Sequence, residues 1–283
     1  MFMNKILVVG SKGQLGTDCM SVLGAEVVGV DLPEIDISDR FQCLEKLDAI
    51  EPEVIVNCAA YTAVDACETD PACWKVNADG PKHLAEWAAA NGAFLVHVST
   101  DYVFSGDKPL FEACVESDST DPISEYGKSK LAGEQAILES GAQAAILRTA
   151  WLYGSTGNNF LKTMLRLTTE NPGKAFKVVN DQFGSPTCSY TLARQIQSVA
   201  DYRETGVFHA TSEGYCTWYD LACAFLDRLK IEHHFVPCGT DEFPTPTKRP
   251  ANSILANVRL KELGINLFGD WKEELSAYVE RGA

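Results

Sequence analysis

The sequence has no run of about 18 consecutive apolar residues, the minimum for a transmembrane helix. Its 10 cysteines include no Cys-x-x-Cys pair, and its 5 histidines show no metal-ligand spacing with cysteines or carboxylates. A membrane span, a structural metal and a disulfide framework are therefore not expected. We predict reduced, mostly buried thiols and a cytoplasmic location.

Basic side chains are also scarce. The sequence has 24 Lys and Arg against 39 Asp and Glu, a formal net charge of -15. Binding to DNA or RNA depends on clustered Lys and Arg that displace counterions, so no nucleic-acid partner is expected. This charge would also repel a small dianionic ligand. A phosphate site must then be built locally, from helix N-termini and a few basic side chains.

Short apolar segments alternate with helix-like segments in the first half of the chain. Such segments, apolar throughout, predict an α/β fold with a doubly wound, parallel Rossmann-type sheet covered on both faces. The expected strands span residues 5–10, 26–30, 54–57, 94–99 and 144–148, and a helix is expected over 79–91.

Two units are expected from the length of 283 residues, at about 150 residues per domain. The predicted dinucleotide-binding domain comprises residues 1–152 and roughly 181–205. A smaller C-terminal substrate-binding lobe would comprise roughly 153–180 and 206–283.

A glycine-rich loop directly follows the first expected strand. It reads Gly10-Ser11-Lys12-Gly13-Gln14-Leu15-Gly16. Glycines let the backbone approach a pyrophosphate, whose charge then faces the N-terminus of the next helix. The spacing alone also fits a plain strand-to-helix turn, but its position after the N-terminal strand favours a dinucleotide site.

Asp31 directly follows the second expected strand, where the carboxylate can bind the adenosine ribose of the cofactor. A carboxylate there should repel a 2′-phosphate, so NADH is slightly favoured over NADPH. Lys12 could offset part of this repulsion, but we expect it to be a solvated surface charge.

Tyr126 and Lys130 form a Tyr-x-x-x-Lys pair. Four residues apart on a helix, they share one face, so the ammonium can lower the phenol's pKa from about 10. The pattern is frequent by chance and also fits an exposed tyrosine beside a solvated lysine. Thr100, however, ends an expected strand at the ligand-binding edge of the sheet. The three side chains together suit proton transfer to a carbonyl.

Basic residues in the second half are candidates for a diphosphate. Lys162 and Arg166 lie one turn apart on an expected helix, a pattern typical of a solvated face. Arg249 lies in a proline-rich loop, and its guanidinium can bind two phosphate oxygens at once. We therefore expect Arg249 to be the diphosphate ligand.

These motifs together closely resemble those of the extended short-chain dehydrogenases, and within them the dTDP-4-dehydrorhamnose reductase family. The resemblance extends over nearly the whole chain. The matching segments are 10–16, 54–65, 99–104, 126–134, 148–153, 157–160, 180–187 and 244–250.

The resemblance implies reduction of the C4 keto group of dTDP-4-dehydro-L-rhamnose to dTDP-L-rhamnose by NADH or NADPH, the last step of dTDP-rhamnose biosynthesis. Tyr126 would protonate the alkoxide, Lys130 would hold the nicotinamide ribose, and Thr100 would bind the carbonyl oxygen. The implied cofactor-binding residues are Gly10, Gly13, Gln14, Leu15, Gly16, Asp31, Asp36, Ile37, Ala59, Ala60, Tyr61, Tyr126 and Lys130. The implied substrate-binding residues are Thr100, Asp101, Trp151, Asn159 and Arg249.

The chain departs from the family pattern at two places. Cys58 stands where alanine is expected, a small residue for another. Some bacterial members are thought to dimerise through magnesium held by acidic side chains. Asp18 and Glu280 match two such positions, but Tyr190 stands at a third. A bound metal is therefore not expected, and a monomer or a homodimer is left open.

Two other functions fit the same fold. A nucleotide-sugar epimerase or dehydratase shares the Tyr-Lys pair, but a dehydratase of this class should carry Asp-Glu after the threonine. Here Thr100 is followed by Asp101 and Tyr102, so elimination of water would lack its second carboxylate. A non-catalytic regulatory subunit, like the partner of methionine adenosyltransferase, need not retain the catalytic group.

Overall fold

A computed structural model describes residues 5–24 and 26–282. Its centre is a six-stranded sheet with the order β10-β5-β4-β3-β1-β2, in which every neighbouring pair is parallel. The strands are β1 (Ile6–Val9), β2 (Val28–Val30), β3 (Val54–Asn57), β4 (Phe94–Thr100), β5 (Gln143–Thr149) and β10 (Gly206–His209). The strand order reverses between β1 and β3, and ligands of doubly wound sheets bind beside such a reversal.

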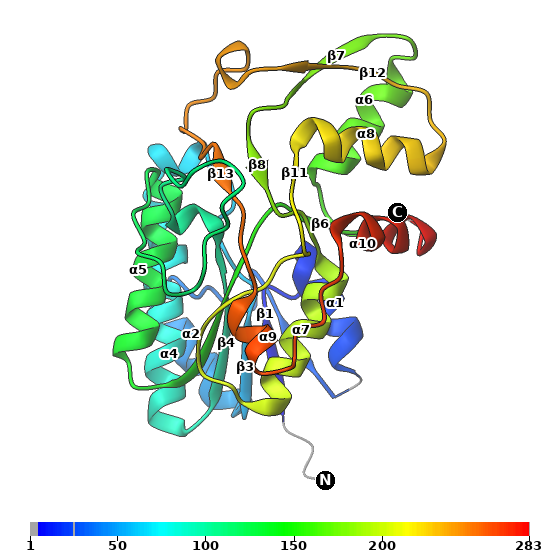
Figure 1. The fold of residues 1–283 in the computed structure, drawn as a ribbon. Helices are drawn as coiled ribbons and strands as arrows, with labels where there is room; N and C mark the ends of the chain where they lie inside the picture. Colours follow the sequence, from blue (N-terminus) through cyan, green and yellow to red (C-terminus); the bar gives the residue numbers. More distant parts are fainter. Residues whose placement is uncertain (1–4, 25, 283) are drawn as a thin grey trace.

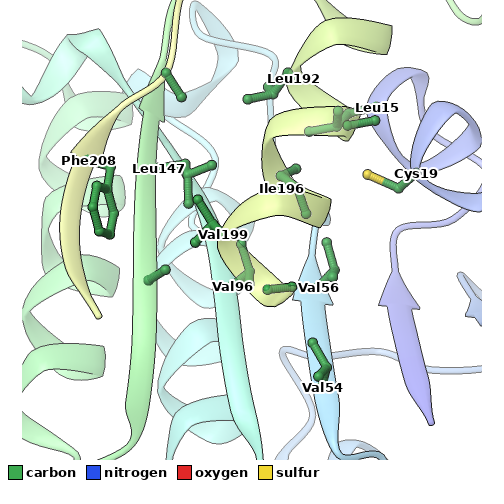
Figure 2. Close-up of a cluster of buried hydrophobic side chains, with 14 of the residues drawn as sticks. Leu15, Cys19, Val54, Val56, Val96, Leu147, Leu192, Ile196, Val199 and Phe208 are labelled. Carbon is green, nitrogen blue, oxygen red and sulfur yellow. The ribbon is translucent and has the colours of Figure 1, made fainter. Parts of the chain in front are cut away.

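Helices cover both faces of this sheet, which confirms the predicted doubly wound fold (Figure 1). One face packs against α1 (Gln14–Leu23) and α7 (Ser189–Tyr202). Figure 2 shows Leu15 and Cys19 of α1 and Ile196 of α7 packed beside Val56 and Val96 of the sheet. The opposite face packs against α2 (Arg40–Ile50), α4 (Gly80–Asn91) and α5 (Glu125–Glu139).

A smaller lobe lies above the carboxyl ends of the central strands in Figure 1. Its hydrophobic core includes side chains from α6 (Phe160–Glu170), α8 (Trp218–Leu229) and α10 (Trp271–Glu280). Its small sheets pair β6 (Leu152–Tyr153) with β9 (Thr187–Cys188), β7 (Ala175–Val179) with β12 (His234–Cys238), and β8 (Phe183–Gly184) with β11 (Cys216–Thr217) and β13 (Asn252–Ser253).

Short helical segments complete the chain. They are η1 (Ala66–Glu68), α3 (Ala72–Trp74), η2 (Lys75–Asp79), η3 (Asp101–Val103), η4 (Thr240–Glu242) and α9 (Val258–Glu262). Residues 206–209, which the sequence had placed with the lobe, form β10 at the edge of the central sheet. No helix in the described part of the chain is long and apolar enough to cross a membrane.

The expectation of reduced thiols is wrong for one pair of cysteines. Cys67 and Cys73 form a disulfide, with their Cα atoms 5.3 Å apart. The chain turns from η1 into α3 between them, which brings together two cysteines that are six residues apart in sequence. The other eight cysteines are free and mostly buried.

Candidate active site

The glycine loop connects β1 to α1, and its geometry requires glycine. Gly10 has φ +80°, and a Cβ atom on it would lie 2.7 Å from the backbone nitrogen of Ala59. A Cβ on Gly16 would lie 2.0 Å from the carbonyl oxygen of Gly10. The loop therefore packs backbone against backbone, and no described side chain makes a capping hydrogen bond to the first turn of α1 at its N-cap, Gly13. This arrangement fits a dinucleotide pyrophosphate.

Asp31 lies directly beside this loop. Its carboxylate accepts hydrogen bonds from the backbone N–H of Lys12, at 2.9 Å, and of Leu32, at 2.8 Å. The side chain of Lys12 is exposed and pairs with Glu34 at 3.2 Å. The negative charge of Asp31 is thus fixed at the end of β2, where the adenosine ribose of a dinucleotide would lie.

The remaining candidate cofactor residues lie on the loops that follow β2 and β3 and at the start of α1. The backbone of Ala59 donates to Asn57 Oδ1, and that of Tyr61 donates to Asn77 Oδ1, which fixes the loop through Ala60. Asp36 accepts from Ser38, and Ile37 is buried against Gly80. Gln14 and Leu15 begin α1, and Leu15 packs into the core.

Tyr126 is brought to the end of β4 by close packing of α5. Ser124 caps this helix by accepting a hydrogen bond from the Gly127 N–H. A Cβ on Gly127 would lie 2.2 Å from the carbonyl oxygen of Tyr102, so only glycine permits this contact between α5 and η3. The rings of Tyr102 and Tyr126 then pack edge to face, 5.5 Å apart.

Thr100 and Asp101 lie beside the Tyr126 phenol. Thr100 Oγ1 donates to Asp101 Oδ1 at 2.9 Å, while Asp101 Oδ2 is buried without a hydrogen-bond partner among the described residues. Burial raises the pKa of Asp101 to about 6. Burial, and then the charge of Asp101, raise the pKa of Tyr126, and a hydrogen bond with Thr100 opposes the rise. The phenol is therefore protonated at neutral pH.

Lys130 lies one turn further along α5 and is 1% exposed. Its Nζ donates to the carbonyl oxygen of Val98 at 2.7 Å and lies 3.3 Å from His97 Nε2. Burial lowers the pKa of Lys130 to about 8. The sequence pattern had suggested that Lys130 lowers the pKa of Tyr126, but here the amine is turned toward β4 and burial raises the pKa of the phenol.

The sequence analysis missed the polar groups that surround Lys130. His97 and Asn57 are fully buried on neighbouring strands. Glu134, one turn beyond Lys130, forms a buried ion pair with Arg148 at 2.7 Å and accepts from Ser99 Oγ at 2.5 Å. A histidine in the middle of an otherwise apolar strand is the sequence signal that could indicate them.

Two candidate substrate-binding residues, Arg249 and Trp151, contact residues next to the catalytic group or in the smaller lobe. Arg249 donates to Tyr102 Oη at 3.0 Å and pairs with Asp65 at 3.3 Å. Its side chain also borders a cavity of about 320 Å³, whose other lining residues are Phe160, Met164, Lys177, Val178, Val179, Gln182, Trp218, Phe243 and Thr245. Trp151 has φ +47° and stacks on Trp218, with ring centroids 3.6 Å apart.

The other candidates lie elsewhere. Asn159 caps α6 and donates to Gln14 Oε1 at 2.9 Å, so it lies at the glycine loop. Lys162 donates to backbone carbonyls of the 155–157 turn, and Arg166 pairs with Glu170 on an exposed face. At the positions considered for magnesium, Asp18 accepts from Ser189, and the ring of Tyr190 lies 4.7 Å from the guanidinium of Arg281.

The chain is similar to known proteins over nearly its full length. The family model of the RmlD substrate binding domain matches residues 3–283. A dTDP-4-dehydrorhamnose reductase from Burkholderia thailandensis is 39% identical, over 95% of each chain. A dTDP-4-keto-6-deoxy-D-glucose reductase from Streptomyces niveus is 38% identical, over 95% of this chain and 94% of the relative.

A solved structure shares the same fold. The crystal structure of dTDP-4-dehydrorhamnose reductase from Bacillus anthracis, in complex with NADP, superposes with a TM-score of 0.94 at 34% identity. The superposition covers 98% of this chain and 99% of that chain.

Proposed function

The chain belongs to the dTDP-4-dehydrorhamnose reductase family, and we propose that it reduces the C4 keto group of dTDP-4-dehydro-L-rhamnose to dTDP-L-rhamnose. This reaction is the last step of dTDP-rhamnose biosynthesis. The observation that carries the proposal is the position of Thr100 and the protonated Tyr126 at the carboxyl end of β4, with Lys130 one turn along α5.

NADH or NADPH would supply the hydride when bound. Its pyrophosphate would lie on the backbone of Gly10, Gly13 and Gly16 at the start of α1. Asp31 would bind the adenosine ribose, and Ala59 to Tyr61 would border the other side. Lys130 would hold the nicotinamide ribose.

Tyr126 would act as the general acid of the reduction. Its raised pKa keeps a proton on the phenol at neutral pH, and that proton can pass to the alkoxide that develops as the carbonyl is reduced. Thr100, hydrogen-bonded to Asp101, would orient the carbonyl oxygen toward the phenol. Asp101 and Trp151 would contact the sugar.

The nucleotide would bind in the lobe. The cavity that Arg249 borders combines aromatic and aliphatic walls with the amide of Gln182, a combination suited to a base. Arg249 lies between this cavity and Tyr102, so its guanidinium would bind the diphosphate that joins base and sugar. Asn159, which is hydrogen-bonded to Gln14, would contact the substrate from the side of the glycine loop.

We propose that NADH is slightly favoured over NADPH. The fixed carboxylate of Asp31 would repel a 2′-phosphate, and Lys12, the nearby cation of the loop, already pairs with Glu34. The relative from Bacillus anthracis binds NADP, so we expect a preference rather than exclusion.

A second candidate substrate is dTDP-4-keto-6-deoxy-D-glucose, which the Streptomyces niveus relative is named for. Both substrates carry the same nucleotide and the same C4 keto group, and they differ in sugar stereochemistry. The contacts of Thr100 and Tyr126 with the keto oxygen do not distinguish them.

The test is to incubate the purified protein with each sugar nucleotide and either NADH or NADPH. Cofactor oxidation and the configuration of the product at C4 would be followed. We expect oxidation with dTDP-4-dehydro-L-rhamnose and formation of dTDP-L-rhamnose. Faster turnover of the D-sugar would favour the second candidate. No oxidation with either would favour the non-catalytic alternative.

A further inference from the structure

The amine of Lys130 faces an imidazole in the interior of the protein. Lys130 Nζ lies 3.3 Å from His97 Nε2 and donates to the carbonyl oxygen of Val98 at 2.7 Å. His97 is 0% exposed and Lys130 is 1% exposed, so water does not separate or screen them. Whether His97 Nε2 carries a proton therefore directly affects whether the lysine is charged.

Hydrogen bonds on the far side of the ring determine where the imidazole proton lies. Asn57 is the neighbour of His97 across β3 and β4, and its Nδ2 lies 3.0 Å from His97 Nδ1. The backbone N–H of Ala59 donates to Asn57 Oδ1 at 3.1 Å. A backbone N–H can only donate, so the amide oxygen must face Ala59 and the amide NH₂ must face the ring.

His97 Nδ1 is consequently a hydrogen-bond acceptor. Burial keeps the pKa of His97 well below its usual value, so the ring is neutral and carries a single proton. That proton must be on Nε2, the nitrogen that faces Lys130. An ammonium has three donors and no acceptor, so a charged Lys130 would place two donors against each other. A neutral amine has a lone pair that can accept from Nε2–H.

We infer that His97 is a positioning residue that stabilises the neutral amine of Lys130 through its Nε2–H, and that Asn57 and Ala59 fix the tautomer required for this. The inference rests on the role proposed above for Lys130 only where it concerns catalysis. Its consequence is a lysine whose amine can take up and release a proton near neutral pH.

The other charged and titratable groups around Lys130 do not hold it in its charged form. From α5, the charge of Glu134 favours the ammonium, and from the end of β3 so does Cys58. Glu134 is already engaged by both Arg148 Nε and Nη2, at 3.0 and 2.7 Å. Burial outweighs both influences, and the pKa of Lys130 is lowered to about 8. Tyr126 lies on the same helix and is protonated.

The tautomer can be tested first, without any assay of activity. In cofactor-free protein labelled with ¹⁵N-histidine, the His97 signals should show a proton on Nε2 and none on Nδ1. Asn57→Asp replaces the amide NH₂ with an oxygen that accepts from the ring, so the proton should move to Nδ1. A proton on Nδ1 in the wild-type protein would overturn the inference.

The effect on Lys130 is tested with His97→Gln, whose side-chain oxygen can accept from an ammonium at the former Nε2 position. The pKa of Lys130, followed by NMR of ¹³C-labelled lysine in cofactor-free protein, should rise by about one unit, a tenfold change in proton affinity. His209→Gln is the matched control: His209, on β10, is equally buried, but it contacts the Cys114 carbonyl and not Lys130. An unchanged Lys130 pKa in His97→Gln would also overturn the inference.

The same variants separate this inference from the proposed function. If charged Lys130 is needed for turnover, kcat should fall as pH rises through about 8, and this limb should move about one unit higher in His97→Gln. If the lysine pKa moves but the limb does not, His97 controls Lys130 as inferred and the catalytic role proposed for Lys130 is wrong. If His97→Gln does not fold, Asn57→Asp should raise the same pKa.

Discussion

Arg249 and Asp65 form an ion pair, in which Arg249 Nη2 lies 3.3 Å from each carboxylate oxygen. The side chains are 27% and 41% exposed, and a pair this open to water is worth about 0.2–1 kcal/mol. A diphosphate carries more charge and can bind the guanidinium at two oxygens. We therefore expect the diphosphate to displace Asp65 at little cost.

The first prediction tests this exchange. Arg249→Lys cannot form the bidentate contact, and the loss of about 1.5–3 kcal/mol should lower kcat/KM for the sugar nucleotide roughly ten- to hundredfold. Cofactor affinity should be unchanged. Asp65→Asn should lower KM by about two- to fivefold, because the competing charge is removed. Arg166→Lys, on the exposed face of α6, is the control.

If Arg249→Ala lowers the melting temperature and leaves the kinetics of the folded enzyme unchanged, Arg249 is structural. The diphosphate would then be held by Lys162, Arg166 or backbone amides.

Removal of the Tyr126 hydroxyl is the second prediction. Tyr126→Phe should reduce kcat by roughly 10²–10⁴-fold, because the general acid is lost, while the dissociation constant for NADH measured by fluorescence stays nearly constant. Tyr153→Phe is a matched control, since the Tyr153 hydroxyl is buried in the lobe and has no hydrogen-bond partner in the part of the chain that the structure describes. Near-normal turnover of Tyr126→Phe would refute the assignment.

Asp31 provides the third prediction, on cofactor choice. Asp31→Ala should shift the ratio of kcat/KM values toward NADPH by about fivefold, the effect of about 1 kcal/mol of like-charge repulsion in water. Asp31→Asn keeps an acceptor for the Lys12 N–H and removes only the charge, so it should produce a similar shift. If neither variant changes the ratio, Asp31 does not lie at the adenosine ribose.

Much of the fold and of the position of the candidate site can be predicted from local sequence patterns. Residues 54–57 form β3 as predicted, because a run that is apolar on both faces suits a central parallel strand. The glycine loop and the end of β4 also lie where the alternation of strands and helices places them. Each of these features depends on residues that are close together in the chain.

Contacts between distant residues were not predictable in this way. Arg249 and Asp65 are 184 residues apart, and His97 and Lys130 are 33 apart. Such pairs depend on how the lobe and α5 pack against the sheet. The same holds for the pKa of Tyr126, which the Tyr-x-x-x-Lys spacing suggests is lowered but which burial beside Asp101 raises.

The buried Asp101 provides the fourth prediction, on stability and pH. Its pKa is about 6 in the folded protein against 3.8 ordinarily, so the folded state favours the protonated form. The stability that this group contributes is present below about pH 4 and is lost as pH rises through about 6. Asp101→Asn is neutral throughout, so its stability relative to wild type should increase over that range, by on the order of 3 kcal/mol.

The measurement is urea unfolding of both proteins at several pH values between about 4 and 7. Asp118→Asn is a control with a nearly flat response, because a hydrogen bond from Lys108 lowers the pKa of Asp118, so its contribution changes only below about pH 4. The stability of that variant relative to wild type should stay nearly constant between about pH 4 and 7. A pH-independent difference between Asp101→Asn and wild type would contradict the prediction.

The last prediction concerns the buried ion pair of Glu134 and Arg148, whose side chains are 1% and 6% exposed. Removing one partner leaves an uncompensated charge in the interior, which costs about 3–5 kcal/mol. Among the described residues, Arg148 Nη1 already has no hydrogen-bond partner, and Glu134 is the acceptor for Nε and Nη2. Glu134→Gln should therefore lower the free energy of unfolding by about this amount.

Glu125→Gln is the control for this prediction, because it breaks the exposed pair with Lys128 and should cost at most about 1 kcal/mol. Replacing both partners, as in Glu134→Leu with Arg148→Met, removes both buried charges and should recover much of the loss. If the double variant is no more stable than Glu134→Gln, the pair stabilises the contact between α5 and β5 by its specific hydrogen bonds rather than by charge compensation.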